Sequence, residues 1–212
     1  MSALEATPAR LRAAAALRRL TSEFLLRDAS EDDLDDLAVV ADSLSAGLAA
    51  GPARRRSFDE IVAEPDAPEI ADGAAVEHFD QCFVTGPAHP AGLAATVRRE
   101  ADAVELRVRI PVLFEGMPGH AHGGIVAAIF DDLIGMVMGR LHRVPAPTVQ
   151  VDVGFRRPVP LDAEVVFRAE LSGSDGRKRT VQASAHVGDI LHATATGLLV
   201  VLNPDQLVAG LR

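Results

Sequence analysis

One segment, residues 115–140, restricts the folds available to this chain more than any other part of it. A loop rich in glycine and histidine, residues 116–124, leads directly into an apolar run long enough for about four helical turns. Two adjacent carboxylates, Asp131 and Asp132, interrupt the run about two turns after its start. A carboxylate in an apolar helix is costly to bury unless it is paired or used, and a helix that starts behind glycines offers backbone N–H groups to an anion. We therefore take this segment as a candidate active site.

Strand-like segments lie on both sides of this helix. Residues 93–99 and 104–111 precede it and turn at residues 100–103, and residues 82–84 are a shorter apolar candidate. Four more segments follow the helix: residues 148–155, 164–171, 179–187 and 191–202. Turns are expected between them at residues 157–160, 172–176 and 188–189. Successive hairpins with one helix between them predict an α+β fold, in which an antiparallel sheet packs against a single buried helix.

The chain divides into two parts by composition. We expect a helical N-terminal extension and linker in residues 1–76 and a main domain in residues 77–212. The linker carries three consecutive arginines, Arg54, Arg55 and Arg56, which suit either a solvated loop or contact with a nucleotide phosphate.

Two amphipathic helices are expected in the extension. Residues 8–27 and 31–49 space their apolar positions as a helix does, with Pro8 near one start and Ser30 before the acidic first turn of the other. Two helices of this size cannot bury both apolar stripes by themselves. We therefore expect them to cap the main domain or to lengthen a dimer contact.

The acidic excess of the chain is confined to its first part. Residues 1–80 carry 8 basic and 17 acidic side chains, whereas residues 81–212 carry 13 of each. Such a surface repels nucleic acid and anionic lipid, so we expect neither nucleic acid nor a membrane as a partner. No run of apolar residues reaches membrane-spanning length, and the N-terminus lacks the apolar core of a signal peptide. With Cys82 as its one cysteine, the chain cannot form an internal disulfide, and the cytoplasm is the expected compartment.

Residue spacing argues against several kinds of catalytic site. His120 and His122 lie two apart in a loop, without the i, i+4 spacing of a helical zinc pair and without a nearby cysteine, so no metal is expected. Cys82 has no helix N-terminus or local base in the sequence, and neither a G-x-S-x-G motif nor a P-loop lysine occurs. A carboxylate with an oxyanion site at a helix start remains, and it needs no cofactor. The pattern equally allows one aspartate to contact a neighbouring strand or subunit while the other faces solvent.

Three ordered blocks carry a resemblance to a known family. The sequence Gly-His-Ala-His-Gly-Gly at residues 119–124, with Asp131 nine residues after His122, resembles the G-x-x-H-G-G…D signature of the PaaI-type hotdog-fold thioesterases. Residues 148–160 are similar to the strand that follows in that family, and residues 82–93 resemble the turn through which its chains enter the fold. The resemblance covers residues 79–202 and leaves the first 75 residues uncovered.

The resemblance implies a hotdog fold, in which a curved antiparallel sheet wraps around one long helix. It also implies a homodimer or a dimer of dimers, with active sites made from two subunits, and an acyl-CoA thioester as substrate. On this basis Asp131, not Asp132, is the general base or nucleophile, the Gly123 N–H donates to the thioester carbonyl, and His122 orients or polarises that group. Thr148 matches a Ser/Thr position that places water, contributed across the dimer interface.

Further positions complete the expected substrate site. Gly119 and Gly124 belong to the signature loop and are assigned to substrate binding. Arg156 and Arg157 suit the phosphates of CoA, although solvation of a strand end is an equally good use for them. Many relatives carry asparagine six residues before the histidine. Gly116 stands there in this chain, so one polar contact is missing.

The leading prediction is therefore an acyl-CoA thioesterase. A thiolate is a good leaving group, so a carboxylate and an oxyanion donor suffice without a Ser-His-Asp triad. One alternative is a hotdog hydratase or dehydratase, which needs Asp and His arranged for proton transfer to carbon, and no second motif of that kind is present. Another is a non-catalytic protein that binds acyl-CoA or serves as a scaffold, in which Gly116 reflects relaxed selection on the site.

Overall fold

The computed structural model describes residues 6–53 and 69–202 of the 212-residue chain. Six strands form one sheet in the order β1-β2-β4-β5-β6-β3, and all five neighbouring pairs are antiparallel. The strands are β1 (Val97–Glu100), β2 (Ala103–Val108), β3 (Thr148–Phe155), β4 (Val165–Asp175), β5 (Lys178–Val187) and β6 (Ile190–Val200). β1 and β3 are therefore the edges of this sheet.

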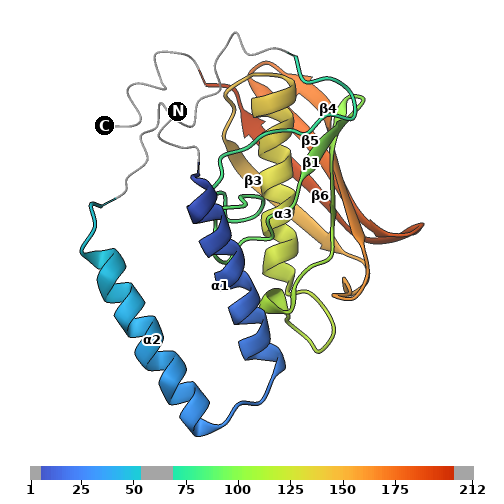
Figure 1. Cartoon of the computed structure of the whole chain (residues 1–212). Helices are drawn as coiled ribbons and strands as arrows, with labels where there is room; N and C mark the ends of the chain where they lie inside the picture. Colours follow the sequence, from blue (N-terminus) through green and yellow to red (C-terminus); the bar gives the residue numbers. More distant parts are fainter. Residues whose placement is uncertain (1–5, 54–68, 203–212) are drawn as a thin grey trace.

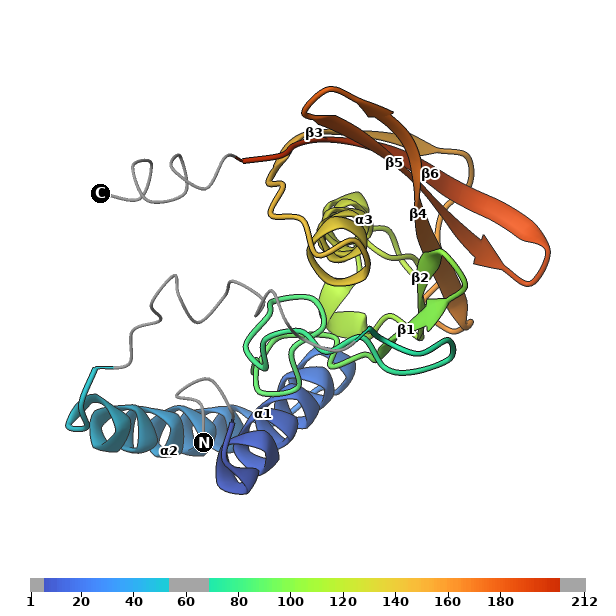
Figure 2. The ribbon, with the colours of Figure 1, turned by 90° about the horizontal axis from the view of Figure 1, so that it is seen from above.

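The central helix, α3 (Gly123–Met136), lies in the curve of the sheet and continues into a π-helical turn, η3 (Val137–Leu141) (Figures 1 and 2). Seven of its apolar side chains are buried: Ile125, Val126, Ile129, Phe130, Leu133, Ile134 and Met136. Phe130 meets Phe167 of β4 edge to face, with 5.4 Å between ring centroids. Burial of each large apolar side chain stabilises the fold by about 1.5–3 kcal/mol, so this run takes the centre of the core. The predicted arrangement of one helix inside an antiparallel sheet is confirmed.

The helix and the sheet approach each other closely at Gly197 of β6. A Cβ atom at this position would lie 2.6 Å from Cγ2 and 2.9 Å from Cδ1 of Ile134. Real Cβ atoms do not approach other atoms so closely. The glycine at residue 197 therefore allows α3 to pack this close to the backbone of β6.

Strand boundaries differ from the prediction in several places, among them the strand expected at residues 104–111, which ends at Val108. The turn expected at residues 172–176 is wrong, because β4 continues through Asp175 and the chain turns at residues 176–177. The Ser172 hydroxyl donates to the Thr180 carbonyl oxygen, so pairing across the hairpin overrides the local turn preference of these polar residues. The strand expected at residues 93–99 begins at Val97, and residues 82–84 do not form a strand.

Residues 69–96 cover the side of α3 that faces away from the sheet (Figure 2). Ala75 pairs with Arg98 of β1, and the Val76 N–H donates to the Val97 carbonyl oxygen at 2.8 Å. The central helix is thus enclosed between the sheet and this irregular segment. The arginines at residues 54–56 lie outside the described residues.

The two N-terminal helices form where the sequence predicts them, as α1 (Pro8–Leu26) and α2 (Glu31–Ala49). The Thr7 and Ser30 hydroxyls accept from the N–H groups of Arg10 and Asp33, which fixes each helix start. In the parts of the chain that the structure describes, no helix has the length and hydropathy to cross a membrane.

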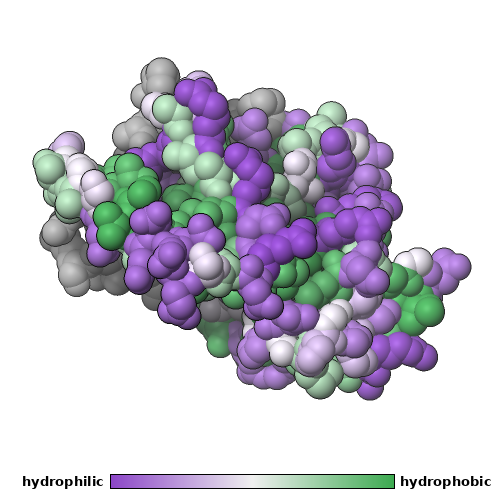
Figure 3. Space-filling model, turned by 60° about the horizontal axis from the view of Figure 1, so that its bottom comes forward, coloured by the Kyte–Doolittle hydropathy of each residue, from purple (hydrophilic) through white to green (hydrophobic). Residues whose placement is uncertain are grey.

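The contacts of α1 and α2 differ. The Arg18 guanidinium in α1 donates to the carbonyl oxygens of Pro87 at 2.9 Å and His89 at 2.7 Å, and Ala14 is buried. No residue of α2 is buried, and Leu48 is 82% exposed. Figure 3 shows one face of the molecule, on which hydrophobic residues lie exposed beside hydrophilic ones. Within one chain α1 caps the domain, whereas the apolar side chains of α2 remain on the surface.

Candidate functional site

The start of α3 is held by its own N-cap residue. The His122 Nδ1 accepts a hydrogen bond from the Gly124 N–H at 2.9 Å, and the His122 N–H donates to the Phe114 carbonyl oxygen at 2.7 Å. Since Nδ1 is an acceptor here, the neutral imidazole carries its proton on Nε2. His122 therefore fixes the direction of the first helical turn.

This arrangement leaves one backbone donor at the helix start. The N–H groups of Ile125 and Val126 donate to the His122 carbonyl oxygen, and that of Gly124 is taken by the imidazole. Within the described part of the chain, the Gly123 N–H has no acceptor. A free N–H at the positive end of a helix dipole is a donor for an anion or a developing oxyanion.

A pocket of about 320 Å³ opens beside this donor. It is lined by Gly123 and Val126 of α3, by the loop residues Met117, His120 and Ala121, and by residues 155–159 at the end of β3. Arg156 and Arg157 are part of this lining, and both backbone N–H groups donate to the His192 carbonyl oxygen. The Arg157 guanidinium also donates to the Leu191 carbonyl oxygen at 3.1 Å. The pocket thus combines a backbone donor, two cationic side chains and apolar walls.

Two predicted residues do not reach this pocket within one chain. Asp131 is exposed, and it lies eight residues after Gly123, which corresponds to about 12 Å along the helix axis. Thr148 begins β3, whereas Phe155 at its other end is the residue that a Cβ on Gly123 would meet, at 3.2 Å. Seven residues of extended strand separate Thr148 from Phe155 by roughly 23 Å. One chain therefore brings together Gly123, Arg156 and Arg157, but neither Asp131 nor Thr148 with them.

The two other predicted glycines shape the loop. Gly119 has φ +75°, and its N–H donates to the Glu115 carboxylate at 2.6 Å. Gly124 gives its N–H to His122, and a Cβ there would lie 3.0 Å from the His122 Nδ1. Both glycines serve the path of the chain around the helix cap. Their assignment to substrate binding stays a prediction.

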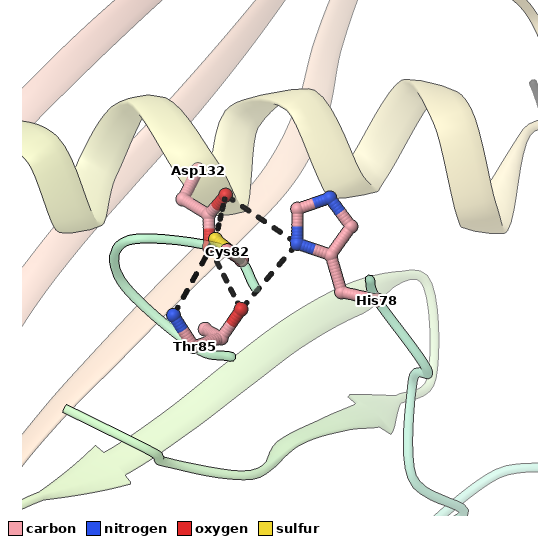
Figure 4. A network of polar contacts seen from close by, with 4 residues as sticks. All are labelled: His78, Cys82, Thr85 and Asp132. Carbon is pink, nitrogen blue, oxygen red and sulfur yellow. Dashed lines mark hydrogen bonds and ion pairs between the residues drawn. The ribbon is translucent and has the colours of Figure 1, made fainter. Parts of the chain in front are cut away.

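A second polar site lies on another side of α3, around Asp132 (Figure 4). Cys82 donates to the Asp132 carboxylate, with Sγ 3.3 Å from Oδ1 and 3.4 Å from Oδ2. The Thr85 hydroxyl donates to Asp132 Oδ2 at 3.2 Å. His78 Nδ1 lies 3.6 Å from Asp132 Oδ1 and 3.4 Å from the Thr85 Oγ1. We call these four residues the Asp132 cluster.

Burial sets the acidity of this cluster. The pKa of Asp132 is raised to about 6, mainly by desolvation and in a smaller part by the charge of Asp131, while the hydrogen bonds from Cys82 and Thr85 oppose the rise. Burial also raises the pKa of the Cys82 thiol, and the neighbouring Asp132 charge adds to that shift. A thiol whose pKa is raised is a poor nucleophile, so the cluster is not an activated-cysteine site.

A larger pocket, of about 680 Å³, opens beside the cluster. His78, Thr85 and Arg140 belong to its lining, so the cluster is reached from solvent at one side. Burial lowers the pKa of the Arg140 guanidinium, and the charge of Glu77 partly offsets this effect.

The sequence did not predict the Asp132 cluster. It indicated no base near Cys82, yet the fold places a carboxylate from 50 residues later at hydrogen-bond distance. A local signal existed in the spacing His78-x-x-x-Cys82-x-x-Thr85, which puts three polar groups in one short segment. The sequence predicts a short strand at residues 82–84 and a turn after it, and nothing local indicates that this segment packs on α3.

Comparison with known proteins shows which families and structures the chain is similar to. Residues 118–193 match the model of the thioesterase superfamily. Over 94 residues the chain is 34% identical to the acyl-coenzyme A thioesterase THEM4 of Rattus norvegicus, which covers 43% of this chain and 40% of the rat protein. The same enzyme of Bos taurus is 33% identical over 94 residues, with 43% of this chain and 38% of the bovine protein covered. The chain thus spans about two fifths of the length of these curated relatives.

A solved structure extends the similarity to the whole fold. The crystal structure of a thioesterase superfamily protein covers 90% of this chain and 94% of its own, with a TM-score of 0.76 and 25% identity. The predicted α+β hotdog architecture is therefore confirmed. The family match begins in the loop before the helix cap and ends in β6, so the part of the chain built around α3 has the hotdog fold and is similar to the thioesterase superfamily.

Proposed function

We propose that this protein is a thioesterase that hydrolyses an acyl-CoA thioester. The observation that carries the proposal is that the Gly123 N–H has no acceptor among the described residues, while Gly123 lines a pocket together with Arg156 and Arg157. The curated relatives are acyl-coenzyme A thioesterases, which supports the substrate class. One free, buried thiol fits a reducing compartment, and we place the protein in the cytoplasm.

In the proposed reaction the Gly123 N–H donates to the thioester carbonyl oxygen. Asp131 takes a proton from a water molecule, and the water oxygen bonds to the carbonyl carbon. The carbonyl oxygen then carries the negative charge that the N–H stabilises. Collapse of this intermediate breaks the C–S bond and releases the acid and the CoA thiolate, which takes up the proton held by Asp131 and leaves as the thiol. Direct attack by the Asp131 carboxylate, followed by hydrolysis of the anhydride, is the other form of the same mechanism.

The arginines suit the other end of the substrate. Arg156 and Arg157 lie at the rim of the same pocket, and guanidinium groups bind phosphate oxygens in paired hydrogen bonds. His122 contributes by holding the helix start, and through it the direction of the Gly123 N–H.

Two copies of the chain are needed for one such site. The Gly123 N–H and Asp131 of one helix are about 12 Å apart along its axis, whereas carbonyl carbon and oxygen are about 1.2 Å apart. The donor and the carboxylate that serve one thioester therefore come from different copies. A homodimer, or a dimer of dimers, follows from this requirement.

The exposed edge of β3 supports the dimer. Val149 and Phe155 of this strand are 58% and 54% exposed, although both are apolar. If two β3 edges pair antiparallel about a two-fold axis, Thr148 of one copy comes opposite Phe155 of the other, near Gly123. This is the position in which Thr148 can place water at a shared site.

The oxyanion donor is tested by a substitution that removes one N–H and little else. Gly123 is the first residue of α3, a position that accepts proline, and His122 before it is extended with ψ 134°, as a residue before proline requires. We expect Gly123→Pro to lower kcat for thiol release from a panel of acyl-CoAs by about 10²–10³-fold. The matched control is Gly123→Ala, which adds the same contact to Phe155 but keeps the N–H. Equal rates in the two variants would sink the oxyanion assignment.

The carboxylate is tested in the same assay. Loss of a general base typically costs about 10²–10⁴-fold in rate, so Asp131→Asn should lose at least the lower figure. Full activity in both Asp131→Asn and Asp131→Ala would rule out the proposed mechanism. Binding of a CoA ester without turnover by the wild-type chain would instead favour the non-catalytic alternative.

A further inference from the structure

The Asp132 cluster contains a set of side chains that the thioesterase reaction does not use. We propose that His78, Cys82 and Asp132 bind one divalent cation of the zinc type, which ties the segment before the sheet to α3. The proposal is independent of the thioesterase site, because neither Gly123 nor Asp131 belongs to it.

The ligand types and their positions in the chain suit zinc. Zn²⁺ is bound by cysteine sulfur, histidine nitrogen and carboxylate oxygen, and this cluster offers one of each. His78 and Cys82 are separated by three residues in one irregular segment, and Asp132 comes from a helix 50 residues further on. Zinc sites commonly pair two ligands at such a short spacing with others from a distant part of the chain.

The distances also suit a shared ion. With bonds of about 2.3 Å to sulfur and 2.0–2.2 Å to nitrogen and oxygen, tetrahedral ligands lie roughly 3.4–3.6 Å apart. The observed separations are 3.3 Å for Cys82 Sγ to Asp132 Oδ1 and 3.6 Å for His78 Nδ1 to the same oxygen. All three ligand atoms lie within 4.8 Å of one another. The remaining separation, between Cys82 Sγ and the His78 ring nitrogen, must shorten by about 1 Å for both atoms to bind one ion. His78 can supply this shift because it lies in an irregular, partly exposed segment.

The charges favour a cation over a network of hydrogen bonds alone. Cys82 and Asp132 are two acids in direct contact at a largely buried position, where the carboxylate charge opposes ionisation of the thiol. A divalent cation reverses this effect, because it stabilises the thiolate and the carboxylate together and releases their protons. The carboxylate contacts both the thiol and the imidazole, so one ion can be shared by all three side chains.

Solvent access is present at one side. His78 and Thr85 line the pocket of about 680 Å³, which gives an ion a path to the cluster. The Thr85 Oγ1, 3.2 Å from Asp132 Oδ2, lies where it can hydrogen-bond to a ligand carboxylate or to a water on the metal (Figure 4). Hydrogen bonds of this kind fix the orientation of metal ligands.

Cobalt provides the test, because Cys82 is the one cysteine of the chain. The full-length protein is treated with a chelator, dialysed and titrated with Co²⁺. We expect saturation at one ion per chain, with a near-ultraviolet sulfur-to-cobalt charge-transfer band that Zn²⁺ abolishes by displacement. Cys82→Ser should remove the band, and His78→Gln and Asp132→Asn should each weaken Zn²⁺ binding by at least about tenfold.

Two control variants lie outside the cluster: Asp131→Asn changes the carboxylate next to Asp132, and His120→Gln changes a histidine of the loop before α3. We expect both variants to bind Zn²⁺ as the wild type does. If the Cys82 variant fails to fold, the unaltered chain still decides, because Zn²⁺ should raise its Tm and protect Cys82 from maleimide labelling. Absence of the charge-transfer band in the wild type, or undiminished binding in His78→Gln and Asp132→Asn, would overturn the proposal.

Discussion

At the scale of single residues, Gly116 is packed against the backbone of the helix cap. A Cβ atom there would lie 2.8 Å from the His122 Cα and 3.2 Å from the His122 N. The Gly116 N–H also donates to the His120 carbonyl oxygen at 2.9 Å. Where many relatives carry asparagine, this loop has no room for a side chain unless the cap moves. The missing polar contact is therefore a consequence of how this loop is folded.

This geometry predicts that asparagine at residue 116 does not raise the proposed rate of thiol release. Because the clash is with backbone atoms of His122, Gly116→Asn should destabilise the protein by roughly 1–3 kcal/mol and lower the rate of thiol release. Thermal unfolding and the acyl-CoA assay measure both effects. Gly135→Ala is the contrasting control, since its Cβ meets nothing within 4 Å and alanine favours a helix interior by up to about 1 kcal/mol. A gain of activity in Gly116→Asn would contradict this explanation.

At the scale of elements, the position of α3 in the sheet depends on one small residue. Gly197 lets the Ile134 side chain approach the backbone of β6, and Ile134 is itself fully buried. The helix that carries both Asp131 and Asp132 is set at its depth by this contact. Substitutions at this contact should therefore lower the stability of the fold directly, and should affect the proposed thioesterase site only through the position of α3.

We expect Gly197→Ala to lower the free energy of unfolding by roughly 1–3 kcal/mol, because the added methyl group overlaps Ile134. Gly173→Ala in the same sheet is the control, since its Cβ would lie 3.7 Å from the nearest atom, an ordinary contact. Combining Gly197→Ala with Ile134→Ala should cost less than the sum of the two single changes, because the atoms that clash are then absent. Strict additivity in denaturant unfolding would show that the two residues do not interact.

At the scale of the whole molecule, the proposed site is divided between two copies of the chain. The physical reason is the distance between the two groups on one helix, because the Gly123 donor and the Asp131 carboxylate lie about 12 Å apart along its axis and cannot act on the same carbonyl group. The exposed edge of β3 provides a surface on which two copies can pair.

Mixing two inactive variants tests this division. If Gly123 and Asp131 of one site come from different copies, a heterodimer of Gly123→Pro and Asp131→Asn holds one site with both residues intact. Random exchange of subunits should then restore about a quarter of the wild-type activity. Each variant alone remains inactive under the same exchange conditions, which provides the control. No recovery, with heterodimers demonstrated by mass spectrometry, would place donor and carboxylate in one chain.

The helices, the sheet and the helix-start loop could be predicted from the sequence because their signals are local. The apolar spacing of residues 123–136, the turn residues between strands and the cap at Ser30 depend on neighbours a few positions away. The signature residues His122, Gly123 and Asp131 lie on one short segment, so the resemblance alone named them.

Contacts between distant segments could be decided only by the tertiary structure. Cys82, Thr85 and Asp132 meet across 47–50 residues, and no local pattern records which face of α3 their segment covers. The same holds for the closeness of Gly116 to His122 and of Gly197 to Ile134, which depend on how the chain returns on itself. The sequence by itself determined the helices and strands, because these follow from backbone propensity and periodicity, and its short signature segment carried the resemblance from which the site was predicted. The packing around α3 determined which carboxylate is buried beside a thiol and which faces outward, because burial is a property of the assembled core.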